Sequence, residues 1–206
     1  MNISVLVATY GADEWRTMAE QRAVPSAVAA EPYEVIAEHQ PDGTVASSCN
    51  AAAAHASGEW LCFLDGDDQL APGFIPAMKA AHERTDVIME THDVLFTPAV
   101  QQLRKGRPRP PFFFPECSLT TGNWLIIGTL VSKTLFDEVG GFDDHPHGLE
   151  DWQLWAKCVK AGASIVKVPK AVYIAHYNQK SKHHMLARDR KAYMVAYEKA
   201  RLSVWG

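Results

Sequence analysis

Short apolar runs alternate with helix-compatible polar segments along the first half of the chain. The apolar runs predict strands at Ile3–Thr9, Tyr33–Glu38, Trp60–Leu64 and Asp86–Phe96. The segments between them predict helices at 13–22, Thr44–Ala56 and Gly73–Arg84, the first stopped near Pro25 and the last opened by Pro72. This βαβαβ order predicts an α/β fold, a Rossmann-like, mostly parallel central sheet with helices on both faces.

Residues 97–121 interrupt this order. The run from Arg104 to Pro111 is basic and rich in proline, and three phenylalanines follow it at 112–114. Because proline removes a backbone donor, we expect a loop here rather than a helix or a central strand. Two interpretations stay open: a mobile surface loop whose phenylalanines pack on the body, or a flexible lid that binds an acceptor.

The second half of the chain predicts a helix, a pair of short strand segments and a C-terminal helix. Their ranges are 150–162, then Ile165–Val168 and Val172–Ala175, then His183–Arg201. The last helix has apolar positions at Met185, Ala192, Tyr193 and Val195, and we expect that face to pack on the domain. We therefore expect one domain at 1–182 and a packed C-terminal helix within 183–206. Alternatively, the basic outer face of this helix touches an anionic membrane or a polyanionic acceptor.

The composition is that of an ordinary soluble globular protein. The chain has 206 residues, of which 47% are hydrophobic and 21% charged, and its net charge of -4 does not indicate a general nucleic-acid binder. The N-terminal apolar stretch has no basic start and is too short for a signal peptide or a transmembrane segment. The four cysteines are scattered without zinc-site spacing, which favours free thiols and a cytoplasmic location.

Three carboxylates follow the strand predicted at 60–64. Asp65, Asp67 and Asp68 are separated only by Gly66, so the segment contains a D-x-D triplet. Gathered negative charge is unfavourable unless a cation neutralises it, and carboxylate oxygens suit Mg²⁺ or Mn²⁺. The alternative is an acidic turn without a metal, because aspartate is also favoured in turns.

Other polar side chains are expected to meet these carboxylates. Ligands of parallel sheets bind beyond the carboxyl ends of the strands, where Thr9 and Tyr10 end the first predicted strand. Glu150 and Asp151 open the helix that follows the glycine turn at 140–141. Acidic residues in a first helical turn are common partners of the helix dipole, but a carboxylate that projects into a cleft from there can act as a general base.

The order of these motifs resembles that of family 2 glycosyltransferases with the GT-A fold, over roughly residues 3–182. The matching segments are Ala8-Thr9-Tyr10, Ser48-Cys49-Asn50, the run from Gly58 to Pro72, Val139-Gly140-Gly141-Phe142-Asp143, and Glu150-Asp151-Trp152-Gln153-Leu154-Trp155. A D-x-D triplet alone is common, whereas D-x-D after an apolar strand, followed by G-G-F-D and E-D-W, is specific. The resemblance implies a hexosyltransferase-type enzyme. It would move a sugar from a nucleotide-diphosphate donor, most often a UDP-sugar, to an acceptor hydroxyl with inversion.

The resemblance also implies a role for each motif. Asp67 and Asp65 would hold Mn²⁺ or Mg²⁺, and Asp151 would be the catalytic base, with Glu150 as the charged neighbour that raises its pKa. His176 is a further candidate metal ligand, although a lone histidine after a strand is more often structural. The residues implied to bind the nucleotide sugar are Thr9, Tyr10, Glu38, Asn50, Asp65, Gly66, Lys180 and Ser181.

The chain departs from the family pattern at two places. Cys49 precedes Asn50, where the family commonly has arginine. The second predicted strand ends in Glu38-His39-Gln40, where the family usually has paired aspartates. Both departures leave the nucleotide open. Two other functions also stay open: a nucleotidyltransferase-like enzyme, although Thr9–Glu14 lacks the glycine-rich basic loop this needs, and a catalytically silent protein that binds sugar nucleotides. The motifs do not encode the oligomeric state or the acceptor, whether protein, lipid, polysaccharide or modified nucleic acid.

Overall fold

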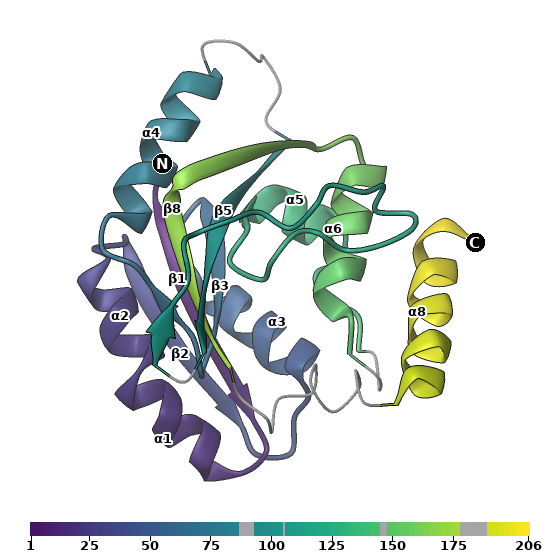
Figure 1. Cartoon of the computed structure of the whole chain (residues 1–206), viewed down its shortest axis with the longest axis horizontal. Helices are drawn as coiled ribbons and strands as arrows, with labels where there is room; N and C mark the ends of the chain where they lie inside the picture. The colour runs from purple at the N-terminus through teal and green to yellow at the C-terminus, as the bar shows by residue number, and fades with distance from the viewer. Residues whose placement is uncertain (87–92, 105, 145–147, 178–188) are drawn as a thin grey trace.

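The computed structural model describes residues 1–86, 93–104, 106–144, 148–177 and 189–206 (Figure 1). Its strands are β1 (Ile3–Tyr10), β2 (Glu34–Gln40), β3 (Trp60–Asp65), β4 (Gln69–Leu70), β5 (Val94–Arg104), β6 (Arg107–Pro108), β7 (Leu130–Ser132) and β8 (Ser164–His176). Its helices are α1 (Asp13–Gln21), α2 (Ala23–Ala29), α3 (Val45–His55), α4 (Phe74–Asp86), α5 (Lys133–Glu138), α6 (Glu150–Lys160) and α8 (Arg190–Trp205).

One sheet joins all the strands in the order β2-β1-β3-β7-β5-β8-β4, with β6 paired to β5. The long strands β1, β2 and β3 pair in parallel, and so do β5 and β8. The short strands β7, β4 and β6 pair antiparallel to their neighbours. The predicted α/β fold with a mostly parallel sheet is therefore confirmed.

Helices cover both faces of the sheet, and each face has its own apolar core (Figure 1). In β1, Val5 and Val7 face the core that α1, α2 and α4 complete, whereas Leu6 faces the core of α3, α5 and α6. Side chains alternate across a strand, so a run that is apolar at every position is buried on both faces. This explains why β1 is apolar from Val5 to Ala8 and β3 from Trp60 to Leu64.

The helix α3 begins where its sequence predicts. Thr44 caps it, because its side chain accepts a hydrogen bond from Ser47 N at 3.1 Å while Thr44 N donates to Ser47 Oγ at 2.8 Å. This reciprocal pair satisfies backbone donors that have no partner within the helix. It fixes the start of α3 beside the carboxyl ends of β1 and β2.

The helix predicted at 13–22 is α1, but Pro25 is not what ends it. Pro25 lies in the first turn of α2, where a missing backbone donor costs nothing. One predicted strand boundary is wrong. Asp86 was expected to begin a strand but ends α4, and the next strand begins at Val94. Residues 87–92 of that predicted strand lie outside the described part of the chain.

The expectation of a loop throughout 97–121 is also wrong. Thr97–Arg104 continue β5, and β6 turns back on them as a hairpin. Pro98 is accommodated at an irregularity in the β5–β8 register, and Pro108 lies on the short outer strand of the hairpin. Proline is tolerated at such bulges and edges because its missing donor breaks no central ladder. Whether residues 109–121 act as a lid stays a prediction.

The C-terminal helix α8 packs against α6 through a face that matches the predicted one only in part, since Ala192 and Tyr193 are half-buried. The Tyr197 ring stacks on Trp152 at 4.8 Å between centroids, and Ala196, Ala200 and Val204 are buried. Val195, expected on the packed face, is 46% exposed. Residues 183–188 of the predicted helix lie outside the described part of the chain. None of the helices in the described ranges is long and apolar enough to cross a membrane.

Candidate active site

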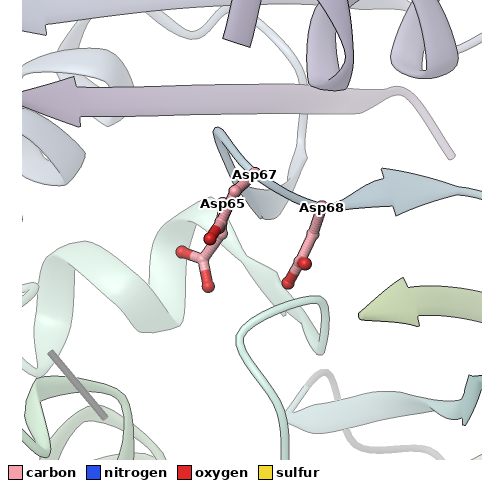
Figure 2. Close-up of side chains that lie close together, drawn as sticks. All are labelled: Asp65, Asp67 and Asp68. Carbon is pink, nitrogen blue, oxygen red and sulfur yellow. The ribbon is translucent and has the colours of Figure 1, made fainter. Parts of the chain in front are cut away.

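The three carboxylates of the D-x-D segment lie together at the carboxyl end of β3. Asp65 ends the strand, and the turn closes with a hydrogen bond from Asp68 N to Asp65 O at 3.0 Å. One carboxylate oxygen from each of Asp65, Asp67 and Asp68 lies within 4.8 Å of the others. The side chains of Asp65 and Asp67 lie close together, with Asp68 beside them (Figure 2). Their hard oxygen donors fit a divalent cation such as Mg²⁺ or Mn²⁺.

Asp68 ties this turn to the end of β8. It accepts a hydrogen bond from the Tyr173 hydroxyl at 2.9 Å and another from His176 N at 2.7 Å. The same hydroxyl accepts a hydrogen bond from Asp65 N at 3.3 Å. Tyr173 therefore holds both ends of the acidic turn, a role that the sequence analysis missed because the tyrosine lies far along the chain in an apolar strand.

The pKa values of the acidic turn show how unfavourable its charge is without a cation. Burial, and then repulsion from Asp67, raises the pKa of Asp68 to about 7. The side chain of Asp65 opens to solvent, yet the surrounding protein displaces enough water to raise its pKa. Repulsion from Asp68, Asp67, Asp151 and Glu150 adds to this rise. A bound cation would relieve the repulsion and keep the carboxylates ionised.

His176 lies beside the acidic turn, where Gln69 holds its ring. Its Nε2 lies 2.8 Å from Gln69 Oε1, while its backbone donates to Asp68. Burial, and then the positive charge of Arg22, lowers the pKa of His176. The ring is therefore neutral at neutral pH, which is the form that binds metals. Arg22 also fixes the turn, since its Nη1 donates to Asp67 O at 2.8 Å.

The end of β1 meets the end of β2 through Thr9. The Thr9 hydroxyl lies 2.9 Å from Nδ1 of His39, its partner in the β1–β2 ladder. Gly66 packs tightly against the same threonine, because a Cβ at this position would lie 2.7 Å from Thr9 Cγ2. The glycine thus lets the acidic turn approach β1. Tyr10 ends β1 and is half-buried.

Two of the predicted nucleotide contacts also have partners within the protein. The carboxylate of Glu38 lies 3.9 Å from His55 Nδ1 at the end of α3. The Asn50 side chain donates to Phe142 O and accepts from Phe142 N, both at 2.9 Å. Asn50 therefore anchors the glycine turn to α3. His39 is the ladder partner of Thr9, whereas Glu38 pairs with Ala8, which also pairs with Asp65. The contact of Glu38 with a nucleotide stays a prediction.

The candidate base Asp151 lies in the first turn of α6 and is held by a neighbouring loop. Its Oδ2 accepts a hydrogen bond from Asn123 Nδ2 at 3.0 Å, and its Oδ1 accepts one from Trp152 N at 2.7 Å. Asn123 Oδ1 in turn accepts from Leu125 N at 3.0 Å, which fixes the orientation of the amide. Asn123 was missed because nothing local in the sequence links it to Asp151.

The carboxyl group of Asp151 has a pKa near neutral pH. Burial and then the charge of Glu150 raise its pKa to about 7, while the hydrogen bonds from Trp152 N and Asn123 oppose the rise. A general base is most effective when its pKa lies near the working pH. The charge of Asp151 also raises the pKa of Asp65. The carboxylates of α6 and of the acidic turn therefore influence each other and belong to one electrostatic site.

The backbone just before α6 is strained. Leu149 has a φ of 73°, in the left-handed region that few residues other than glycine adopt, and Gly148 has a φ of 80°. Such strain is found where the surrounding structure imposes a particular geometry. Here it sets the direction in which Glu150 and Asp151 enter the site.

The remaining predicted residues fall into two groups. Lys180 and Ser181 lie outside the described part of the chain. Cys49, which stands where the family commonly has arginine, is buried near the site, and burial followed by the charges of Asp65 and Glu150 raises the pKa of its thiol. The thiol is therefore neutral and supplies no positive charge to a donor.

A family model described as "Glycosyl transferase family 2" matches residues 12–134. The curated protein "Uncharacterized glycosyltransferase YwdF" of Bacillus subtilis (strain 168) is 26% identical over 168 residues, which are 79% of this chain and 62% of that protein. The chain therefore spans less than two thirds of the length of this relative.

Solved structures with a similar fold include S. aureus TarS. This chain matches it with a TM-score of 0.62 and 18% identity, over 91% of this chain and 38% of that one. A second structure, S. aureus TarS 1-349 in complex with UDP-GlcNAc, matches with a TM-score of 0.59 and 18% identity, over 88% of this chain and 60% of that one. At such low identity these matches show a shared fold.

Proposed function

This chain belongs to glycosyl transferase family 2, and on that premise we propose that it transfers a sugar from a nucleotide-diphosphate donor to an acceptor hydroxyl. One observation carries the proposal: the acidic turn of Asp65, Asp67 and Asp68 shares an electrostatic site with Asp151, whose pKa is about 7. The turn suits the diphosphate side of the reaction, and Asp151 suits the proton transfer. Neither feature needs a residue outside the described part of the chain.

A divalent cation, Mn²⁺ or Mg²⁺, fits the acidic turn. Asp65 and Asp67 would hold it, because Asp68 already accepts two hydrogen bonds from β8. When bound, such a cation neutralises the charge that develops on the leaving nucleoside diphosphate. Asp68, Tyr173 and Arg22 then keep the turn in place rather than serve as ligands. His176, neutral and adjacent, is a further candidate ligand.

Asp151 would take the proton from the attacking hydroxyl. A base on the acceptor side implies direct displacement, in which the sugar is transferred with inversion at its anomeric carbon. Asn123 orients the carboxylate, and Glu150 raises its pKa so that it can both accept and release a proton near neutral pH. Together these contacts prepare one oxygen for proton transfer before the acceptor arrives.

The donor we propose is a UDP-sugar. This agrees with the complex of the structurally similar TarS fragment with UDP-GlcNAc. In this chain the nucleoside would lie over the ends of β1 and β2, contacted by Thr9, Tyr10 and Glu38. Cys49 supplies no charge to the diphosphate, so binding depends more strongly on the metal than in relatives that have arginine there.

A donor screen tests this function. Thermal unfolding with UDP-, GDP- and dTDP-sugars plus Mn²⁺ identifies the nucleotide, since a ligand that binds only the folded state raises the midpoint. Release of nucleoside diphosphate is then measured with the donors that bind. We expect Mn²⁺-dependent release from at least one UDP-sugar. If no sugar nucleotide in the panel yields a nucleoside diphosphate, the transferase proposal fails.

A further inference from the structure

A basic hairpin extends the sheet beside the acidic turn. β5 and β6 form it, with Arg104 paired directly to Arg107. Arg109 continues it, since its N donates to Gln102 O at 3.1 Å. Like charges directly opposite each other destabilise a β pair, so the Arg104–Arg107 pair has an energetic cost that a bound anion would offset.

The three arginines share one face of this hairpin. Paired residues lie on the same face of a ladder and faces alternate along each strand. Arg104 and Arg107 are one pair, Leu103 and Pro108 are the next, and Arg109 lies opposite Gln102. The face of Arg104, Arg107 and Arg109, here called the arginine face, therefore alternates with the face of Leu103 and Pro108.

The arginine face has no neutralising carboxylate among the described residues. All three arginines are exposed, and Arg104 stacks over the Tyr177 ring at 5.2 Å. The acidic residue that follows the hairpin, Glu116, is already paired with Lys167. A concentration of three guanidinium groups thus stands out on a chain whose net charge is -4.

The arginine face begins next to the candidate active site. β5 and β8 run side by side to the same end of the sheet (Figure 1), and Leu103 is paired with His176. Tyr177 N donates to Leu103 O at 3.1 Å, and His176 N donates to Asp68 at 2.7 Å. His176, which contacts the acidic turn, is therefore followed directly by Tyr177, the residue whose ring lies beneath Arg104.

This placement bears on the acceptor. An anionic acceptor would be repelled by Asp65 and Asp67, so it needs cations close by to hold it near the cleft. Guanidinium groups bind phosphate and carboxylate through two parallel hydrogen bonds, which suits a chain with repeated anionic groups. Three arginines on one face of the hairpin would contact neighbouring anionic groups of such a chain.

We propose that the arginine face binds an acceptor chain with repeated anionic groups and holds it with a hydroxyl at the neighbouring cleft. This inference rests on the proposed function, since it names the acceptor of the same site. Phosphate and carboxylate chains share the required chemistry. The experiment below therefore includes one chain of each kind.

Binding of the full chain to inorganic polyphosphate, polygalacturonate and neutral dextran is measured without divalent cations, over about 0.05 to 0.2 M salt. We expect one or both polyanions to bind, and dextran not to bind. The triple variant R104Q/R107Q/R109Q should bind at least about tenfold more weakly at low salt, with a salt dependence smaller by roughly two to three counterions. The charge-conserving R104K/R107K/R109K variant should keep most of the affinity, which separates loss of charge from loss of structure.

A matched control removes three exposed cations elsewhere. R84Q/K191Q/K199Q, on α4 and α8, lowers the net charge equally and should bind polyanion within about twofold of the wild type. The inference is overturned if the wild type binds neither polyanion, if the hairpin glutamine variant binds as well as the wild type, or if the control variant loses as much. Nucleoside diphosphate release is measured separately. An absence of transferase activity would therefore not change the conclusion about polyanion binding by the hairpin.

Discussion

Replacing Asn123 with alanine should move the pH profile of the enzyme without destroying its site. The amide donates to Asp151 Oδ2 at 3.0 Å and so stabilises the ionised base. A hydrogen bond to a charged group contributes about 1.5–3 kcal/mol, and about 1.4 kcal/mol corresponds to one pKa unit. Asn123→Ala should therefore raise the pKa of Asp151 from about 7 by roughly one unit or more.

The assay is kcat/KM for nucleoside diphosphate release between about pH 5.5 and 9.5. In the wild type, Asp151 is about half ionised at pH 7, and activity should fall about tenfold for each unit below that. With a pKa near 8 the variant would be roughly one-tenth ionised at pH 7, so its activity there should drop about fivefold and recover by pH 9. The control Asn2→Ala, at an exposed position, should leave the profile unchanged. An unshifted acidic limb in Asn123→Ala, or a loss that is equal at every pH, would refute the reasoning.

Three further substitutions test the supports of the site. Asp67→Asn should abolish the rise in unfolding temperature that Mn²⁺ produces in the wild type, and an unchanged rise would exclude this residue as a ligand. Tyr173→Phe leaves Asp68 without one of its donors, so it should lower the free energy of unfolding by about 1–3 kcal/mol; denaturant unfolding that matches the wild type would contradict this. Asn50→Ala removes both hydrogen bonds to Phe142 and should cost a similar ~1–3 kcal/mol in the same assay, whereas a loss of donor affinity with wild-type stability would instead mark it as a nucleotide contact.

The sequence predicts those parts of the fold that local patterns encode. Strands β1 and β3 are mostly apolar because helices cover both of their faces, and α3 carries its own cap at Thr44. The hairpin of β5 and β6 was missed because its prolines and arginines disfavour a central strand. In the structure Pro98 lies at a register irregularity and Pro108 on an edge, positions that only the tertiary pairing defines.

The candidate site likewise combines residues that local sequence patterns reveal with residues that only the tertiary structure brings together. The acidic turn and Asp151 can be found from sequence, since strand ends and helix starts show where carboxylates gather. Their supports cannot: Tyr173 reaches the turn from a distant strand, and Asn123 reaches Asp151 from a loop. The contact between Thr9 and His39 was missed because β2 extends to Gln40, and a strand end is the feature that local patterns locate least precisely.

The central claim is that the acidic turn serves the donor while Asp151 transfers the proton. The most direct test measures donor affinity and nucleoside diphosphate release in the same samples of wild type and Asp151→Asn, with Mn²⁺ and the UDP-sugar found in the screen. We predict that the variant keeps the wild-type dissociation constant within about twofold and releases product about 10²- to 10⁴-fold more slowly. Wild-type release by Asp151→Asn would contradict the claim.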